Sequence, residues 1–102
     1  MAAIAGLSHP TMVEHNGIVY VTGYRSGGQY LRRSADGGRT WLPFSNGKEE
    51  RLVGEPSDEA GAGLIKMDSQ GRRLVVAMAN SPAIDIYVSV DEGETWEWES
   101  RV

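Results

Sequence analysis

Short runs of β-branched and aromatic residues, separated by turn signals, recur along the whole chain and predict strands. No window keeps apolar residues at helical spacing. Asn16-Gly17 and Gln70-Gly71 are turn signals of the kind that join antiparallel strands in hairpins. The predicted fold class is therefore all-β, with two four-stranded antiparallel sheets in up-and-down order. The predicted strands are 11–15, 17–24, 29–34 and 40–45 in the first sheet, and 64–68, 73–79, 84–89 and 95–100 in the second.

The second strand of each set is apolar at consecutive positions, not at alternate ones. Val19, Tyr20 and Val21 form such a run in the first set, and residues 74–77 form one in the second. A strand with two apolar faces is covered on both sides. Each sheet is therefore expected to lie between two others, as a blade does in a β-propeller. A lone two-sheet sandwich would alternate more clearly.

An eight-residue pattern, Ser-x-Asp-x-Gly-x-Thr-Trp, occurs twice with an offset of 55 residues. We call residues 34–41 the first octet and residues 89–96 the second octet. Each octet follows the third predicted strand of its set, so the chain is built from two copies of one unit. The shared residues are Ser34, Asp36, Gly38, Thr40 and Trp41 in the first octet, and Ser89, Asp91, Gly93, Thr95 and Trp96 in the second.

Every shared residue type suits a tight hairpin. Asp accepts hydrogen bonds from backbone N–H groups two or three residues on, and Gly adopts the left-handed conformation without a Cβ clash. Ser and Thr hydroxyls are expected to bridge the two arms, and the Trp ring to bury a large apolar area as the outer strand starts. The octets are thus predicted to be structural, because each carboxylate is committed to its own turn.

The two octets resemble the Asp-box, or BNR repeat, of sialidases and related glycan-active proteins. That resemblance implies four-stranded blades of a β-propeller, with the octet on the hairpin between the third and fourth strands, away from any catalytic centre. The length of 102 residues suits a single domain, 1–102, and the predicted strands place blade 1 at about 11–45 and blade 2 at about 64–100. An acidic, Gly-rich connector, 46–63, would join the blades, either as a binding loop or as a plain solvated link.

Two blades leave apolar faces and strand edges uncovered. We therefore expect a homo-oligomer, with a trimer favoured because three chains give the six blades usual for Asp-box propellers, or docking onto a larger assembly. The apolar stretch 2–7 is a candidate latch that pairs with a neighbour's blade.

Composition excludes several classes of function. The net charge is −4 and no basic cluster exists, which excludes the usual nucleic-acid footprint. There is no Cys, and His9 and His15 lack a ligand pattern, so no metal and no cofactor is expected. No apolar run is long enough for a membrane span. The compartment stays open, and without a clear signal peptide the cytoplasm or a virion is favoured.

Three functions remain. The first is a non-catalytic structural or assembly module, for example a virion or phage component. The second is a carbohydrate-binding lectin, whose candidate glycan contacts are Tyr24, Tyr30, Tyr87 and Trp98. The third is a sialidase-like glycoside hydrolase subunit. The resemblance implies that a sialidase draws three Arg, a Tyr–Glu pair and an acidic Asp from different blades, so two blades cannot form the pocket. No residue is assigned a catalytic role.

Overall fold

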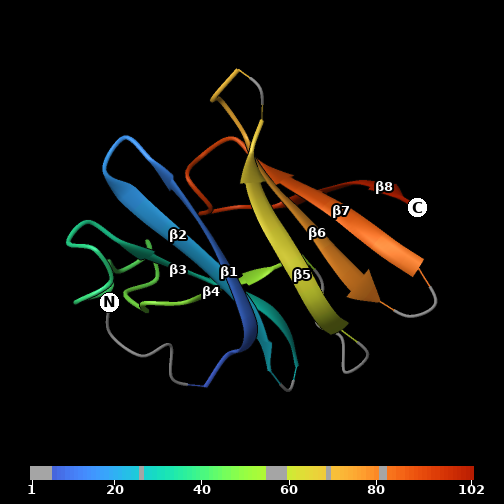
Figure 1. Cartoon of the computed structure of the whole chain (residues 1–102), viewed down its shortest axis with the longest axis horizontal. Helices are drawn as coiled ribbons and strands as arrows, with labels where there is room; N and C mark the ends of the chain where they lie inside the picture. The colour runs from blue at the N-terminus through green and yellow to red at the C-terminus, as the bar shows by residue number, and fades with distance from the viewer. Residues whose placement is uncertain (1–5, 26, 55–59, 69, 81–82) are drawn as a thin grey trace.

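The computed structural model describes residues 6–25, 27–54, 60–68, 70–80 and 83–102, with the side chains at 60–62 and 80 excepted. Within these ranges the chain is all-β and contains two four-stranded antiparallel sheets (Figure 1). The order β1-β2-β3-β4 in one sheet and β5-β6-β7-β8 in the other confirms the predicted up-and-down connection. The strands are β1 (Ser8–His15), β2 (Ile18–Arg25), β3 (Gly28–Ser34), β4 (Arg51–Val53), β5 (Ala60–Met67), β6 (Leu74–Asn80), β7 (Ala83–Ser89) and β8 (Glu97–Arg101).

The fourth strand of the first sheet is not where the sequence predicted it. Residues 41–44 belong to no strand, although Leu42 N donates to Arg33 O over 2.7 Å. Pro43 has no N–H to continue the ladder, and Phe44 turns inward and is buried. The chain then loops back and forms β4, which pairs with β3. The predicted strand 40–45 is therefore wrong, and β4 lies inside the predicted connector.

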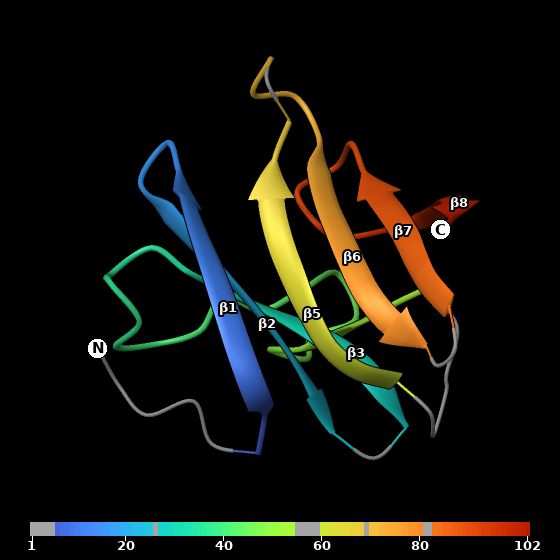
Figure 2. The same cartoon turned by 45° about the vertical axis from the view of Figure 1, so that its right-hand side comes forward.

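The two sheets pack against each other, with β1 and β5 side by side (Figures 1 and 2). The amide of Ile65 on β5 donates to Thr11 Oγ1 on β1 over 3.1 Å. Among the described residues, an apolar core lies between the sheets. Its buried members are Tyr20, Leu31, Phe44 and Val53 from the first sheet side and Ile65, Leu74, Val76, Met78 and Tyr87 from the second.

Strand register makes the two sheets equivalent position by position. In the first sheet, β2 pairs with β3 through Val19 and Ser34; in the second, β6 pairs with β7 through Leu74 and Ser89. The offset of 55 therefore relates β2 and β3 to β6 and β7 throughout. Because direct cross-strand partners share a face of a sheet, each sheet has two faces that can be compared.

We name the two faces of each sheet by this equivalence. The back of the first sheet packs against the front of the second, so the front of the first and the back of the second point away from this junction. Front residues are Met12, Val19, Val21 and Arg32 in the first sheet, which correspond to Ile65, Leu74, Val76 and Tyr87 in the second. Back residues are Thr11, Tyr20, Thr22, Leu31 and Arg33 in the first sheet, which correspond to Leu64, Val75, Ala77, Ile86 and Val88.

The expectation that the second strand of each set is covered on both faces holds for one sheet only. In β2, Val19, Tyr20 and Val21 are all buried. In β6, Val75 and Ala77 on the back are only half-buried. The back of the second sheet is thus incompletely covered by the described part of the chain.

The N-terminal stretch covers part of the front of the first sheet. Leu7 is buried and lies on Gly23, where an added Cβ would be 2.9 Å from Leu7 Cβ. Residues 2–5 of the candidate latch 2–7 lie outside the described residues. The described end of that stretch packs on its own sheet.

Candidate functional site: the octets and the junction between the sheets

In the first octet, the Asp36 carboxylate is the centre of the turn. It accepts hydrogen bonds from Thr40 Oγ1 at 2.6 Å, Thr40 N at 2.9 Å, Ser34 Oγ at 2.7 Å and Arg39 N at 3.0 Å. Ser34 Oγ in turn accepts from Gly38 N at 2.9 Å. The Thr40 hydroxyl, then the Ser34 hydroxyl and the backbone donors, hold the pKa of Asp36 far below its usual range.

The second octet repeats this geometry. Asp91 accepts from Thr95 Oγ1 at 2.6 Å, Thr95 N at 2.9 Å and Ser89 Oγ at 2.7 Å, and Ser89 Oγ accepts from Gly93 N at 2.9 Å. Burial opposes ionisation, but the Thr95 and Ser89 hydrogen bonds outweigh it and lower the pKa of Asp91. In both copies Asp accepts hydrogen bonds within its own turn, but the backbone donors lie three and four residues on in the first octet and four residues on in the second, not two or three as expected. The two hydroxyls meet on the carboxylate and do not bond directly to each other.

The two Trp residues of the octets are less buried than expected. Trp41 and Trp96 are both half-buried. Trp96 packs against the core and its Nε1 donates to Gly93 O at 3.0 Å. The indole therefore closes the second hairpin by a hydrogen bond as well as by apolar contact.

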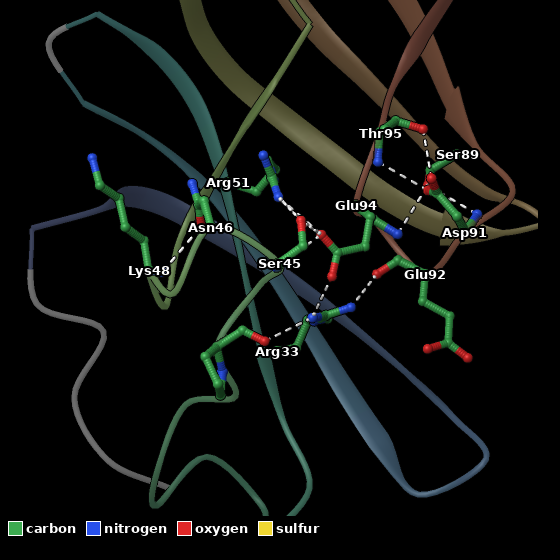
Figure 3. A network of polar contacts seen from close by, with 12 residues as sticks. Arg33, Ser45, Asn46, Lys48, Arg51, Ser89, Asp91, Glu92, Glu94 and Thr95 are labelled. Carbon is green, nitrogen blue, oxygen red and sulfur yellow. Dashed lines mark hydrogen bonds and ion pairs between the residues drawn. The ribbon is translucent and has the colours of Figure 1, made fainter.

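Unlike the first octet, the second octet docks onto the other sheet, and an ionic cluster forms there (Figure 3). We call Arg33, Arg51 and Glu94 the junction lock. Glu94 Oε2 lies 3.2 Å from Arg33 NH2, and Glu94 Oε1 lies 2.8 Å from Arg51 NH2. Ser45 donates to Glu94 Oε1 from its backbone N at 3.2 Å and its Oγ at 3.0 Å. The Ser45 amide is the largest of several influences that lower the pKa of Glu94.

Arg33 is the most buried member of the junction lock, and its side chain is 10% exposed. It donates to two backbone carbonyls, Glu92 O at 3.0 Å and Pro43 O at 3.1 Å. Its guanidinium also lies 3.9 Å from the centroid of the Phe44 ring. Arg33 therefore ties the first sheet, the inward loop and the second octet to one another.

Sequence reasoning did not find the junction lock. Its members are separated by 43 and 61 residues, and Arg51 lay in the predicted connector. One signal was available, because the octets carry opposite charges at one variable position, Arg39 in the first and Glu94 in the second.

The four candidate glycan contacts do not come together. Tyr87 is 6% exposed and belongs to the core. Tyr24 stacks on His9 with ring centroids 5.4 Å apart, and Tyr30 lies under the Arg25 guanidinium at 4.0 Å. Trp98 is 56% exposed on β8.

Asp85 orients Trp98 at the edge of the second sheet. Its carboxylate is buried; Oδ1 accepts from Trp98 Nε1 at 3.1 Å and from Arg101 Nε at 2.8 Å, and Oδ2 accepts from Arg101 NH2 at 3.0 Å. The arrangement fixes the indole while leaving much of it exposed.

Two hollows of about 330 Å³ each flank the sheets. The first lies where turns of both sheets meet, and His15, Tyr20, Arg72 and Glu92 contribute its polar groups. Burial, and then the Glu92 charge, raises the pKa of the Tyr20 phenol. The second hollow is lined by residues that include Arg25, Tyr30 and Glu50.

Within the described residues, no group of three or more His, Cys, Asp or Glu is placed to hold a metal ion. Nor does a helix long and apolar enough to cross a membrane occur in those ranges. No family model, no curated protein and no solved structure matches this chain.

Proposed function

We propose that this chain is a non-catalytic assembly module whose copies join head to tail to complete a β-propeller. The observation that carries the proposal is the set of exposed apolar side chains on the two faces that point away from the junction, of which the first-sheet front is partly covered by the N-terminal stretch. Met12, on the front of the first sheet, is 48% exposed. Leu64 and Ile84, on the back of the second sheet, are 50% and 44% exposed. Large apolar side chains thus lie in the open on the two faces that point away from the junction.

The packing of the first-sheet back on the second-sheet front, within one chain, is the model for the contact between copies. Ile65, the equivalent of Met12, is 2% exposed because the second-sheet front is covered by the first-sheet back. A second copy placed by the same relationship would cover Met12 with its second-sheet back. Such a contact joins two different surfaces, so it closes into a ring or continues as a filament. The resemblance of the octets to Asp-boxes favours six blades, and hence a trimer.

In this proposal the octets act as clasps that keep each blade in shape, and the assembled ring is the working form. A virion or phage particle is one example of a larger structure that such a ring would serve. No residue of the chain is assigned a catalytic role.

Native mass spectrometry tests the proposal. We expect a mass three times the 11.1 kDa of one chain. Met12→Glu and Ile84→Glu should each shift the population to single chains, because each places a charge in an apolar contact. Val90→Glu is the matched control, since Val90 is 74% exposed and belongs to no strand of either sheet. A single-chain mass for the wild type up to about 100 μM would overturn the proposal.

Glycan binding is the second candidate, and the exposed, oriented ring of Trp98 favours it. An aromatic ring fixed by its N–H and open on one face is suited to stacking on a ligand. A glycan array would show saturable binding that Trp98→Ala abolishes. Binding that survives this substitution would rule out the Trp98 platform.

A further inference from the structure

The two octets present opposite charges at one equivalent position. Glu94 belongs to the second octet and reaches the back of the first sheet, where it binds Arg33 and Arg51. With the offset of 55, its counterpart in the first octet is Arg39. Arg39 is exposed, and its guanidinium has no polar partner among the described residues.

The charge of the receiving surface also differs between the two sheets. The back of the first sheet offers Arg33, whose counterpart on the back of the second sheet is Val88. Val88 pairs with Glu97 on β8, and Glu99 lies two residues further along the same strand. By register, the counterparts of Arg33 and Arg51 are Val88 and Ser100, and the two carboxylates occupy neighbouring positions of β8, where the pairing with β7 shifts register.

These carboxylates are accessible to a partner. Glu97 is exposed and has no polar partner among the described residues, while Glu99 is 48% exposed and lies 3.2 Å from Arg73 NH1. The apolar contact that the second octet makes with the first sheet also has an equivalent between copies. Gly93 of the second octet lies on Leu31, so Gly38 of the first octet would lie on Ile86 of another copy.

We propose that copies of this chain dock through a charge-inverted version of the junction lock, in which Arg39 of one copy pairs with Glu97 and Glu99 of the next. This inference rests on the proposed head-to-tail assembly and names the contact that gives it specificity. Because of this inversion, a first sheet docks on a second sheet, so first and second sheets alternate along the assembly. A second octet docked on a second-sheet back would place Glu94 beside Glu97 and Glu99, and like charges repel there.

A charge-swap series tests the proposal, with the dissociation constant of the full-length chain measured by sedimentation at low and high salt. Arg39→Glu and Glu97→Arg should each raise that constant about three- to tenfold at low salt, and by less at high salt. The double variant, Arg39→Glu with Glu97→Arg, should return it to within about twofold of wild type. Arg72→Glu is the charge-matched control, because Arg72 is exposed, belongs to no strand and lines the first hollow.

The outcomes separate this inference from the assembly on which it rests. A wild-type chain that stays single overturns the assembly itself. A wild-type oligomer that neither single variant weakens more than Arg72→Glu does would overturn the charge-inverted contact alone. Weakening by both single variants without recovery in the double variant would also overturn the pairing. Circular dichroism of each variant confirms that the sheets are intact.

Discussion

Gly93 of the second octet lies so close to Leu31 of β3 that a Cβ on Gly93 would be 2.2 Å from Leu31 Cδ2. Leu31 is completely buried, so its side chain cannot swing aside without displacing core neighbours. Gly93 also has a φ of +89°, which disfavours any side chain. One residue thus meets two separate demands, the turn of its own hairpin and close contact with the other sheet.

Gly93→Ala should therefore lower the free energy of unfolding by at least about 2 kcal/mol, from backbone strain plus overpacking. Gly37→Ala is the control, because Gly37 has a φ of +76° with nothing within 4 Å of its added Cβ. It should cost only about 1 kcal/mol. Urea unfolding at one fixed protein concentration measures both variants. Equal costs would show that contact with Leu31 contributes nothing.

Arg33→Met should lower the free energy of unfolding by about 2–4 kcal/mol, because it removes one of the two guanidinium partners of Glu94 and the Arg33 donors to the Glu92 and Pro43 carbonyls. Arg72→Met, at an exposed position, should change it by less than about 0.5 kcal/mol. Thermal and urea unfolding of the two variants measure the difference. If Arg33→Met lowered the free energy of unfolding no more than Arg72→Met does, the junction lock would not stabilise the fold.

The octet carboxylates predict the response to acid. Hydrogen bonds lower the pKa of both Asp36 and Asp91 in the folded chain. A lowered folded pKa contributes stability that is fully present above the unfolded value, about 3.9 for Asp, and is lost as the pH falls below it. Stability should thus decrease from about pH 4 downward.

Asp36→Asn should reduce the loss of folding stability below about pH 4, because an Asn side chain takes up no proton in that range. Thr40→Val should move the Asp36 titration toward higher pH, since it removes the hydroxyl donor at 2.6 Å. Urea unfolding between about pH 2 and 7 follows the stability, and carboxyl NMR shifts follow the titration. An unchanged Asp36 titration in Thr40→Val would contradict the assigned cause of the shift.

Two neighbouring residues on β5 separate core packing from assembly. Ile65→Ala should lower the free energy of unfolding by about 2–5 kcal/mol, because Ile65 is 2% exposed in the core. Leu64→Ala, on the opposite face at 50% exposure, should cost the single chain less than about 1 kcal/mol and still weaken the oligomer. Unfolding of dilute single chains and sedimentation at higher concentration measure the two effects. A Leu64→Ala oligomer as stable as wild type would place the contact elsewhere.

Seven of the eight strands follow from local patterns in the sequence. Apolar runs and turn signals position β1 to β3 and β5 to β8 within about four residues of the described bounds. The β4 position could not be predicted in this way, because it depends on Pro43 leaving the ladder and on Phe44 entering a core that both sheets build. On β4, Arg51 donates a hydrogen bond to Glu94, which lies 43 residues away in sequence.

The sequence by itself determined the turn of each octet, because the side-chain hydrogen bonds of its Ser and Asp join residues no more than four positions apart. Groups so close along the chain meet whenever the hairpin turns, whatever surrounds it. Only the tertiary structure decided that the second octet docks on Leu31 and Arg33 while Arg39 of the first stays exposed. Those contacts depend on which face of one sheet meets which face of the other, and period-two alternation alone does not specify that choice.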